Sequence, residues 1–163
     1  MKYFDARSLG AVAGTEPFGW GGTFAMDVIN RILRRLEAFP DLVYSVGSTS
    51  ITLDPRHPEG FPVSLEESPS GWLITADGWH SHLDDPTETL DFFWFVLSIQ
   101  CRLRVDYRGK KPVCYALEKF GEWGWLEVDR VGRLIVGLFG RKRSEYRQFG
   151  SLGRVIPKKR LDD

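Results

Sequence analysis

The sequence predicts one α+β domain in which a curved antiparallel sheet packs on two helices. Its 163 residues, 42% of them hydrophobic, suffice for one domain with its own core. Helical patterning is confined to residues 24–38 and 86–99, and strand patterning fills most of the rest, ending in a C-terminal meander. This segregation favours α+β over a doubly wound nucleotide-binding fold. We expect residues 23–149 to form the domain and residues 150–163 to form a basic, flexible tail.

Residues 1–22 are expected to form an irregular lead-in, because they contain five glycines and Pro17. A helix then follows over 24–38, with Thr23 as its N-cap and Pro40 as its stop signal. Its apolar stripe recurs every four residues at Phe24, Val28, Ile32 and Leu36. This stripe is the predicted core face of the first helix.

Strand signals separated by proline and glycine fill the stretch between the two helices. The expected strands cover residues 42–46, 50–53, 61–66 and 72–83. Gly78 is expected to kink the last of them, because an isolated glycine interrupts its strand pattern.

The second helix is predicted from its first turn. Asp85 is the expected N-cap, Pro86 takes the first helical position and Glu88 the third, a start that resembles a capping box. Apolar side chains then cover most of the surface: Leu90, Phe92, Phe93, Trp94, Phe95, Val96, Leu97 and Ile99. A helix that is apolar nearly all round is covered by protein. We therefore expect a central core helix, with half of a dimer interface as the alternative.

From Cys101 onward, apolar residues alternate with charged ones, which is typical of strands with one wet face. The expected meander has strands at 101–107, 113–120, 123–128, 133–139 and 143–149, with later turns at 121, 129–132 and 140–142. A first turn at 109–112 places Cys101 opposite residue 118 or 119, and therefore out of reach of Cys114. Both cysteines are expected to be buried free thiols.

The compartment follows from the cysteines and from the missing targeting signals. Two cysteines are too few for a disulfide framework. The apolar stretch at residues 9–13 is shorter than a signal-peptide core, and the most apolar segment, 90–99, is about half of a bilayer span. No lipidation motif is present at either end. We expect a cytoplasmic protein without membrane attachment.

The 22 basic and 22 acidic residues are unevenly distributed along the chain. Residues 1–100 hold 6 basic and 14 acidic residues, a net charge of −8, whereas residues 101–163 hold 16 and 8, a net charge of +8. A basic stripe is expected at Arg141, Lys142, Arg143 and Arg147. It would bind an acidic partner or phosphate, unless it is an ordinary solvated face. Nucleic acid is the less favoured partner, because no helix-turn-helix, zinc-finger or RNA-recognition motif accompanies the stripe.

A minimal divalent-metal site is suggested at His80, His82 and Asp84. Residues two apart on a strand share a face, so the two imidazoles could bind one divalent ion, with the carboxylate as a third ligand. The run resembles in part the His-x-His-x-Asp-His signature of metallo-β-lactamase-type hydrolases, with Asp85 in place of the last histidine. That family also needs histidines downstream, whereas the remaining one here is His57. The alternative is that both aspartates serve the start of the second helix.

Trp123 and Trp125 are candidates for an aromatic binding platform. Two indoles at positions i and i+2 of a strand would form a flat surface, with Gly124 leaving the backbone accessible to a sugar, a base or an apolar side chain. The alternative is that both rings pack inward on the second helix.

Several activities are excluded by the motifs that the sequence lacks. It contains no Gly-x-Gly-x-x-Gly, no Walker-type phosphate loop and no Gly-x-Ser-x-Gly nucleophile elbow. We therefore expect no cofactor, no catalytic residues and a small binding protein, such as an adaptor or an immunity protein, whose partner is another protein. The alternative is a small enzyme or ligand carrier whose pocket lies between the curved sheet and the second helix. A homodimer is compatible with either function.

Overall fold

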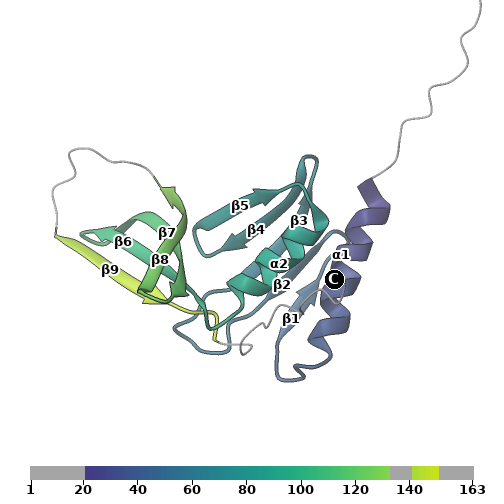
Figure 1. Cartoon of the computed structure of the whole chain (residues 1–163), viewed down its shortest axis with the longest axis horizontal. Coiled ribbons are helices and arrows are strands. Elements are labelled where there is room, and N and C mark those ends of the chain that lie inside the picture. The colour runs from purple at the N-terminus through teal and green to yellow at the C-terminus, as the bar shows by residue number, and fades with distance from the viewer. Residues whose placement is uncertain (1–20, 133–140, 151–163) are drawn as a thin grey trace, which may run out of the picture.

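In the part of the chain that the structure describes, the fold contains two helices and two antiparallel sheets, which confirms the predicted α+β layout. The structure is a computed structural model that describes residues 21–132 and 141–150. The helices are α1 (Gly21–Leu36) and α2 (Pro86–Val96). The five-stranded sheet has the order β1 (Tyr44–Val46), β2 (Ser50–Leu53), β3 (Val63–Ser68), β4 (Gly71–Ala76), β5 (Trp79–Leu83). The four-stranded sheet has the order β8 (Gly124–Gly132), β7 (Lys111–Gly121), β6 (Cys101–Arg108), β9 (Lys142–Arg147). The strands thus form two sheets rather than one, with α2 as the connection between them (Figure 1).

One core cluster runs through both helices, the five-stranded sheet and the inner face of β6 and β7. The α1 stripe at Val28, Ile32 and Leu36 is buried, as its spacing predicts. Strand β4 alternates between buried and half-buried side chains along its whole length, which is the pattern of a strand with one face on the core. The two helices also contact each other directly, because the Arg35 guanidinium lies 4.3 Å from the centre of the Trp94 ring.

Residues 72–83 form a hairpin rather than one kinked strand. Asp77 has a positive φ of 56°, so the chain reverses at Asp77 and Gly78, and β4 pairs with β5. Gly78 lies directly against the second sheet, because a Cβ atom there would come within 2.2 Å of the Tyr115 ring. Any side chain at this position would therefore push the hairpin away from β7.

Helix α2 begins as predicted. The Asp85 carboxylate accepts hydrogen bonds from the backbone N–H groups of Thr87 and Glu88, both at 2.8 Å, and Pro86 stands in the first turn. The helix ends at Val96, three residues earlier than the apolar pattern suggests. Phe93, Trp94, Val96 and Leu97 are buried, whereas Phe92 and Phe95 are half-buried. The helix is therefore covered on most of its surface, but not all round.

Replacing the cap residue tests this helix start. We expect Asp85→Ala to lower the free energy of unfolding by about 1 kcal/mol, because two N–H groups of the first turn lose their acceptor. Urea denaturation followed by circular dichroism measures the change. The neighbouring exposed carboxylate supplies the control: Asp84→Ala should change the stability by less than about 0.5 kcal/mol. Equal effects of the two substitutions would contradict the assigned cap.

The first hairpin of the second sheet has the expected register, but its last strand does not continue the meander. Cys101 pairs with Lys119, as predicted. Strand β9 pairs with β6 instead of following β8, so β6 is a central strand and β9 an edge. The turn expected at 129–132 is wrong, because β8 continues to Gly132. The strand expected at 133–139 lies outside the described residues.

The two sheets are joined by buried contacts of distant residues. The Trp79 indole on β5 is fully buried and donates a hydrogen bond of 3.1 Å to the Asp129 carboxylate on β8. Phe149, just after β9, is also buried, and its carbonyl accepts a hydrogen bond from the Arg56 backbone N–H at 3.2 Å. The C-terminal end of the second sheet therefore packs on the loop between β2 and β3.

The predicted domain boundaries fall mostly outside the described residues. Helix α1 already includes Gly21 and Gly22, which belong to the expected lead-in. Residues 1–20 and residues 151–163 of the expected tail are not described. Neither helix in the described ranges has the length and apolar character that crossing a membrane requires.

Candidate functional site

The outer face of the second sheet, which points away from the core, holds an unusual buried carboxylate. Glu118 on β7 has only 4% of its side chain exposed. Arg102 donates a hydrogen bond of 2.7 Å to it from Nε, and Arg104 donates a second one from Nη1. Both arginines lie on β6 next to Glu118 in the register, since Arg102 pairs with it directly. Two guanidinium groups thus compensate one buried negative charge.

This ion-pair network continues to the sheet edge. Arg104 also donates to Glu127 on β8 at 2.8 Å, and Arg130 donates to the same carboxylate at 2.7 Å. The hydrogen bonds from Arg130 and Arg104 lower the pKa of Glu127, because they favour its charged form. The network therefore fixes side chains across β6, β7 and β8.

The Arg102 guanidinium is stacked between two aromatic rings. Its central carbon lies 4.2 Å from the centre of the Trp125 ring on β8 and 4.1 Å from that of Tyr146 on β9. Phe120 supports Trp125 from the side, with ring centres 5.2 Å apart. Stacking covers both faces of the guanidinium and leaves its edges for hydrogen bonds. We call Arg102, Trp125 and Tyr146 the arginine sandwich.

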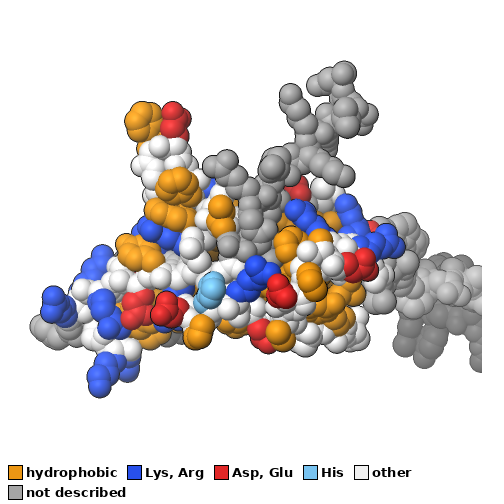
Figure 2. Space-filling view, turned by 90° about the horizontal axis from the view of Figure 1, so that it is seen from below, with side chains coloured by type: hydrophobic (Ala, Val, Ile, Leu, Met, Phe, Trp, Pro, Cys, Tyr) orange, Lys and Arg blue, Asp and Glu red, His pale blue; other side chains and the backbone are white. Residues whose placement is uncertain are grey.

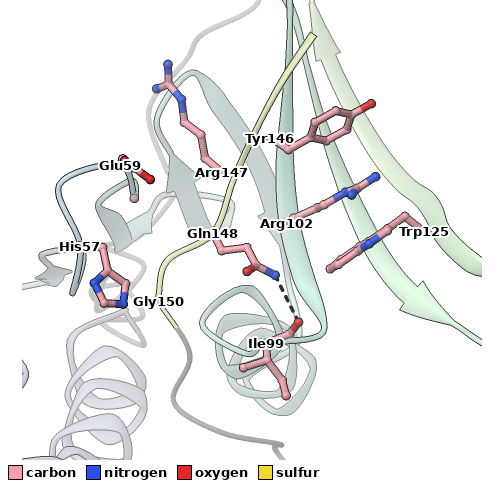
Figure 3. A pocket seen from close by; sticks show the side chains of 10 residues that line it. His57, Glu59, Ile99, Arg102, Trp125, Tyr146, Arg147, Gln148 and Gly150 are labelled. Carbon is pink, nitrogen blue, oxygen red and sulfur yellow. Dashed lines mark hydrogen bonds between the residues drawn. The ribbon is translucent and has the colours of Figure 1, made fainter.

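A pocket of about 490 Å³ lies beside the arginine sandwich, where the loop after β2 meets the second sheet (Figure 3). Its lining residues are His57, Glu59, Gly60, Ile99, Arg102, Trp125, Tyr146, Arg147, Gln148 and Gly150. In Figure 3, His57 and Glu59 lie on one side of Gln148 and the sandwich on the other. The Gln148 amide donates to the Ile99 carbonyl at 3.4 Å. We call this space the junction pocket.

The loop approaches the second sheet closely because glycines stand at two contact points. A Cβ atom on Gly60 would lie 2.9 Å from the Gln148 carbonyl oxygen. Gly150 has a positive φ of 100°, and a Cβ atom there would lie 3.1 Å from the His57 ring. Because neither glycine has a side chain, the loop after β2 and the segment after β9 can approach each other closely at the wall of the junction pocket.

A second, more apolar depression lies between α2 and the hairpin of β7 and β8. This groove has a volume of about 320 Å³ and is lined by Glu88, Asp91, Phe92, Phe95, Lys119 and Val128. Val128 is an extra residue in the β8 ladder, because Leu117 pairs with Asp129 but Glu118 pairs with Glu127. We call this depression the helix groove. It lies between a sheet and the second helix, as the alternative function requires.

The suggested metal ligands lie on the edge strand β5. His80 and His82 are both exposed, with ring centres 6.2 Å apart and the rings nearly perpendicular. Asp84 is exposed and follows the strand. Within residues 21–132 and 141–150, no group of three or more His, Cys, Asp or Glu side chains is arranged to hold a metal ion. The structure thus brings the two imidazoles together but adds no third ligand to them.

The two candidate tryptophans have separate surroundings. Trp125 is on the outer face and belongs to the arginine sandwich. Trp123 precedes β8 in the turn of the hairpin and is 88% exposed, so it does not pack inward on α2. No ring contact joins the two indoles within the described residues. Their surroundings therefore differ: Trp125 lies in the arginine sandwich, and Trp123 is exposed to solvent before the start of β8.

The residues of the expected basic stripe are divided by strand alternation and by ion pairs. Arg143 pairs with Glu145 at 2.8 Å and stacks on Tyr107. Arg147 pairs with Glu145 and with Asp77, each at 3.0 Å. Arg141 and Lys142 are exposed, and with Arg143 and Gly109 they line a separate depression. Carboxylates thus partly neutralise the C-terminal half of the stripe.

Both cysteines are free, but only Cys101 is buried as expected. Burial raises the pKa of the Cys101 thiol far above its ordinary value, so it carries no negative charge at neutral pH. Cys114 is half-buried, which corrects the prediction, because it lies on the outer face of the second sheet opposite Asp106. Desolvation by burial raises its pKa as well.

Sequence reasoning missed Arg102, Tyr146 and His57 as site residues. Alternation of Arg102 with apolar neighbours shows that it is on the wet face, but not what it contacts there. The arginine sandwich depends on the pairing of β9 with β6, which no local pattern indicates.

A comparison of the chain with models of protein families, with curated proteins and with solved structures finds no match.

Proposed function

We propose that this chain is a small non-catalytic binding protein that recognises a protein partner through the junction pocket. The observation that carries the proposal is the arginine sandwich at the wall of that pocket. Tryptophan, tyrosine and arginine are the residue types that contribute most to protein–protein affinity. The three side chains of the arginine sandwich already hold one another in place by stacking, so little side-chain entropy is lost when a partner binds.

The chemistry of the pocket favours an acidic side chain of the partner. The Arg102 Nε atom donates its hydrogen bond to Glu118. The two Nη groups of Arg102 make no hydrogen bond within the described residues. An arginine with both faces stacked offers its edge to a carboxylate. His57 across the pocket adds a second donor, while Glu59 would reject a partner with excess negative charge. We infer a single carboxylate beside an apolar side chain that packs on Tyr146.

The free cysteines also support a cytoplasmic location as part of this proposal. Neither Cys101 nor Cys114 is in a disulfide, as is usual for proteins kept in a reducing compartment.

A pair of substitutions in the arginine sandwich tests the function. The wild-type chain, immobilised at low and moderate salt, should retain a protein that mass spectrometry identifies. Arg102→Lys should weaken binding of that protein about tenfold, or about 1.4 kcal/mol. Lysine keeps the charge that faces Glu118 but loses the planar stack and the two-pronged edge. Tyr146→Ala should weaken binding to a similar extent, because Tyr146 is 55% exposed beside the pocket.

The control is Tyr44→Ala in β1, a partly exposed aromatic residue on the other sheet. It should retain the same protein with unchanged affinity. The proposal fails if no protein is retained under either salt condition. It also fails if Arg102→Lys and Tyr146→Ala bind the partner as tightly as the wild-type chain does.

A further inference from the structure

The end of the β7–β8 hairpin and the helix groove fit each other, and we propose that a second copy of this chain fills the groove. Glu122 and Trp123 form the hairpin end. Figure 2 shows a narrow projection on the side of the second sheet, with a hydrophobic and an acidic side chain together at its tip. In the proposed dimer, the hairpin end of each copy enters the helix groove of the other.

Trp123 is the most exposed large hydrophobic side chain in the described part of the chain, at 88%. An indole as exposed as this contributes little to the stability of the monomer, whereas burying one removes about 150–250 Å² from water. The nearby Leu126 and Val128 side chains are also about half exposed. The hairpin therefore carries exposed apolar side chains both at its end and beside the groove, as interaction sites do.

The helix groove offers the side chains that an inserted Trp123 needs. Phe92 and Phe95 form an apolar floor that remains half-buried in the monomer. Asp91 stands on one rim, where its carboxylate could accept the indole N–H of an inserted Trp123. A buried tryptophan usually requires such an acceptor.

One side of the groove offers a basic partner for Glu122. Lys119 lines the groove on the hairpin side, and it is exposed. Glu122 precedes Trp123 directly, so an inserted hairpin end brings a carboxylate next to this ammonium group. Because the other charged residues of the groove are the carboxylates Glu88 and Asp91, the Glu122 carboxylate fits only at its Lys119 side.

The two surfaces lie on one hairpin, which makes a symmetric dimer feasible. Trp123 and Val128 are five residues apart, or roughly 17 Å along an extended strand. Two hairpins that approach in opposite directions about a twofold axis would place each Trp123 over the groove of the other copy. Such an isologous arrangement buries both grooves and both indoles at once and cannot continue into fibres.

The mass in solution tests the dimer directly. Analytical ultracentrifugation of the whole chain across the micromolar range should show a species of twice 18.6 kDa. Trp123→Ala should yield a monomer with unchanged circular dichroism, because the indole makes no contact that the monomer needs. Tyr44→Ala, a partly exposed aromatic residue in the five-stranded sheet, is the matched control and should remain dimeric.

Charge reversal tests the fit of the two surfaces. Glu122→Lys and Lys119→Glu should each weaken the dimer at least tenfold, because like charges then meet at both entrances. Mixing the two variants should restore a dimer, since each entrance again pairs opposite charges. Restoration on mixing would not follow from a folding defect in either variant.

Three results would overturn the inference: a wild-type monomer across the whole range, a dimer that persists in Trp123→Ala, or no recovery when the charge variants are mixed. A groove that instead binds an apolar ligand or another protein would appear as a monomer in the first measurement. The junction pocket contains neither Trp123 nor any helix-groove residue, so these outcomes leave the proposed partner site untouched.

Discussion

Trp79→Ala should lower the free energy of unfolding by about 3–5 kcal/mol, the range for removing a large aromatic side chain from a core. Trp79 is fully buried between the two sheets, where its ring lies 5.9 Å from that of Phe92. It also donates its indole N–H to Asp129. The substitution would leave a cavity and an acceptor without its donor. Urea denaturation followed by far-UV circular dichroism measures the loss.

Trp79→Phe separates the two contributions. Phenylalanine keeps most of the apolar contact but cannot donate to Asp129, so we expect a smaller loss of about 1–2 kcal/mol. If Trp79→Ala cost no more than Trp79→Phe, the ring would not be the contact that joins the sheets.

The second large effect is expected at Arg104. Arg104→Met should lower the free energy of unfolding by about 3 kcal/mol, near the lower end of the range for breaking a buried ion pair. It removes one of the two guanidinium groups that compensate Glu118, while Arg102 remains. Methionine has a similar length, so the change is mainly one of charge and hydrogen bonding. The same denaturation experiment measures it.

Arg130→Met is the matched control, because it makes the same chemical change in the same network. Arg130 pairs with the partly exposed Glu127 and is itself 52% exposed, so its loss should cost less than about 1 kcal/mol. The double variant Glu118→Gln/Arg104→Met should cost less than the sum of the single variants, because the buried charge is then also removed. Strict additivity would contradict direct coupling between Arg104 and Glu118.

The features that the sequence predicts well are those set by neighbouring residues. The start of α2 depends on Asp85 and Pro86, which act within one turn, so a single sequence contains all the information needed. The short turn at the end of β6 sets the pairing of Cys101 to within one residue, and a register shift between Asp106 and Tyr107 makes Lys119 its partner.

The features that the sequence does not indicate depend on residues that are far apart. Nothing in the pattern of 143–149 specifies whether that strand joins β8 or β6, because both partners offer the same alternation of apolar and charged residues. The candidate site depends on this choice, since β9 carries Tyr146 to Arg102. The sequence therefore predicts the wet face of the second sheet, but not the arginine sandwich on it.

Phe149 has a consequence for the order in which the chain acquires structure during translation. Its side chain completes a core that is otherwise built from residues up to 117, and its backbone closes on the loop at Arg56. Ribosomes deliver the N-terminal helices and the first sheet well before this segment emerges. Until Phe149 emerges, the nascent chain retains an open apolar seam, so its core closes only after this segment has been synthesised.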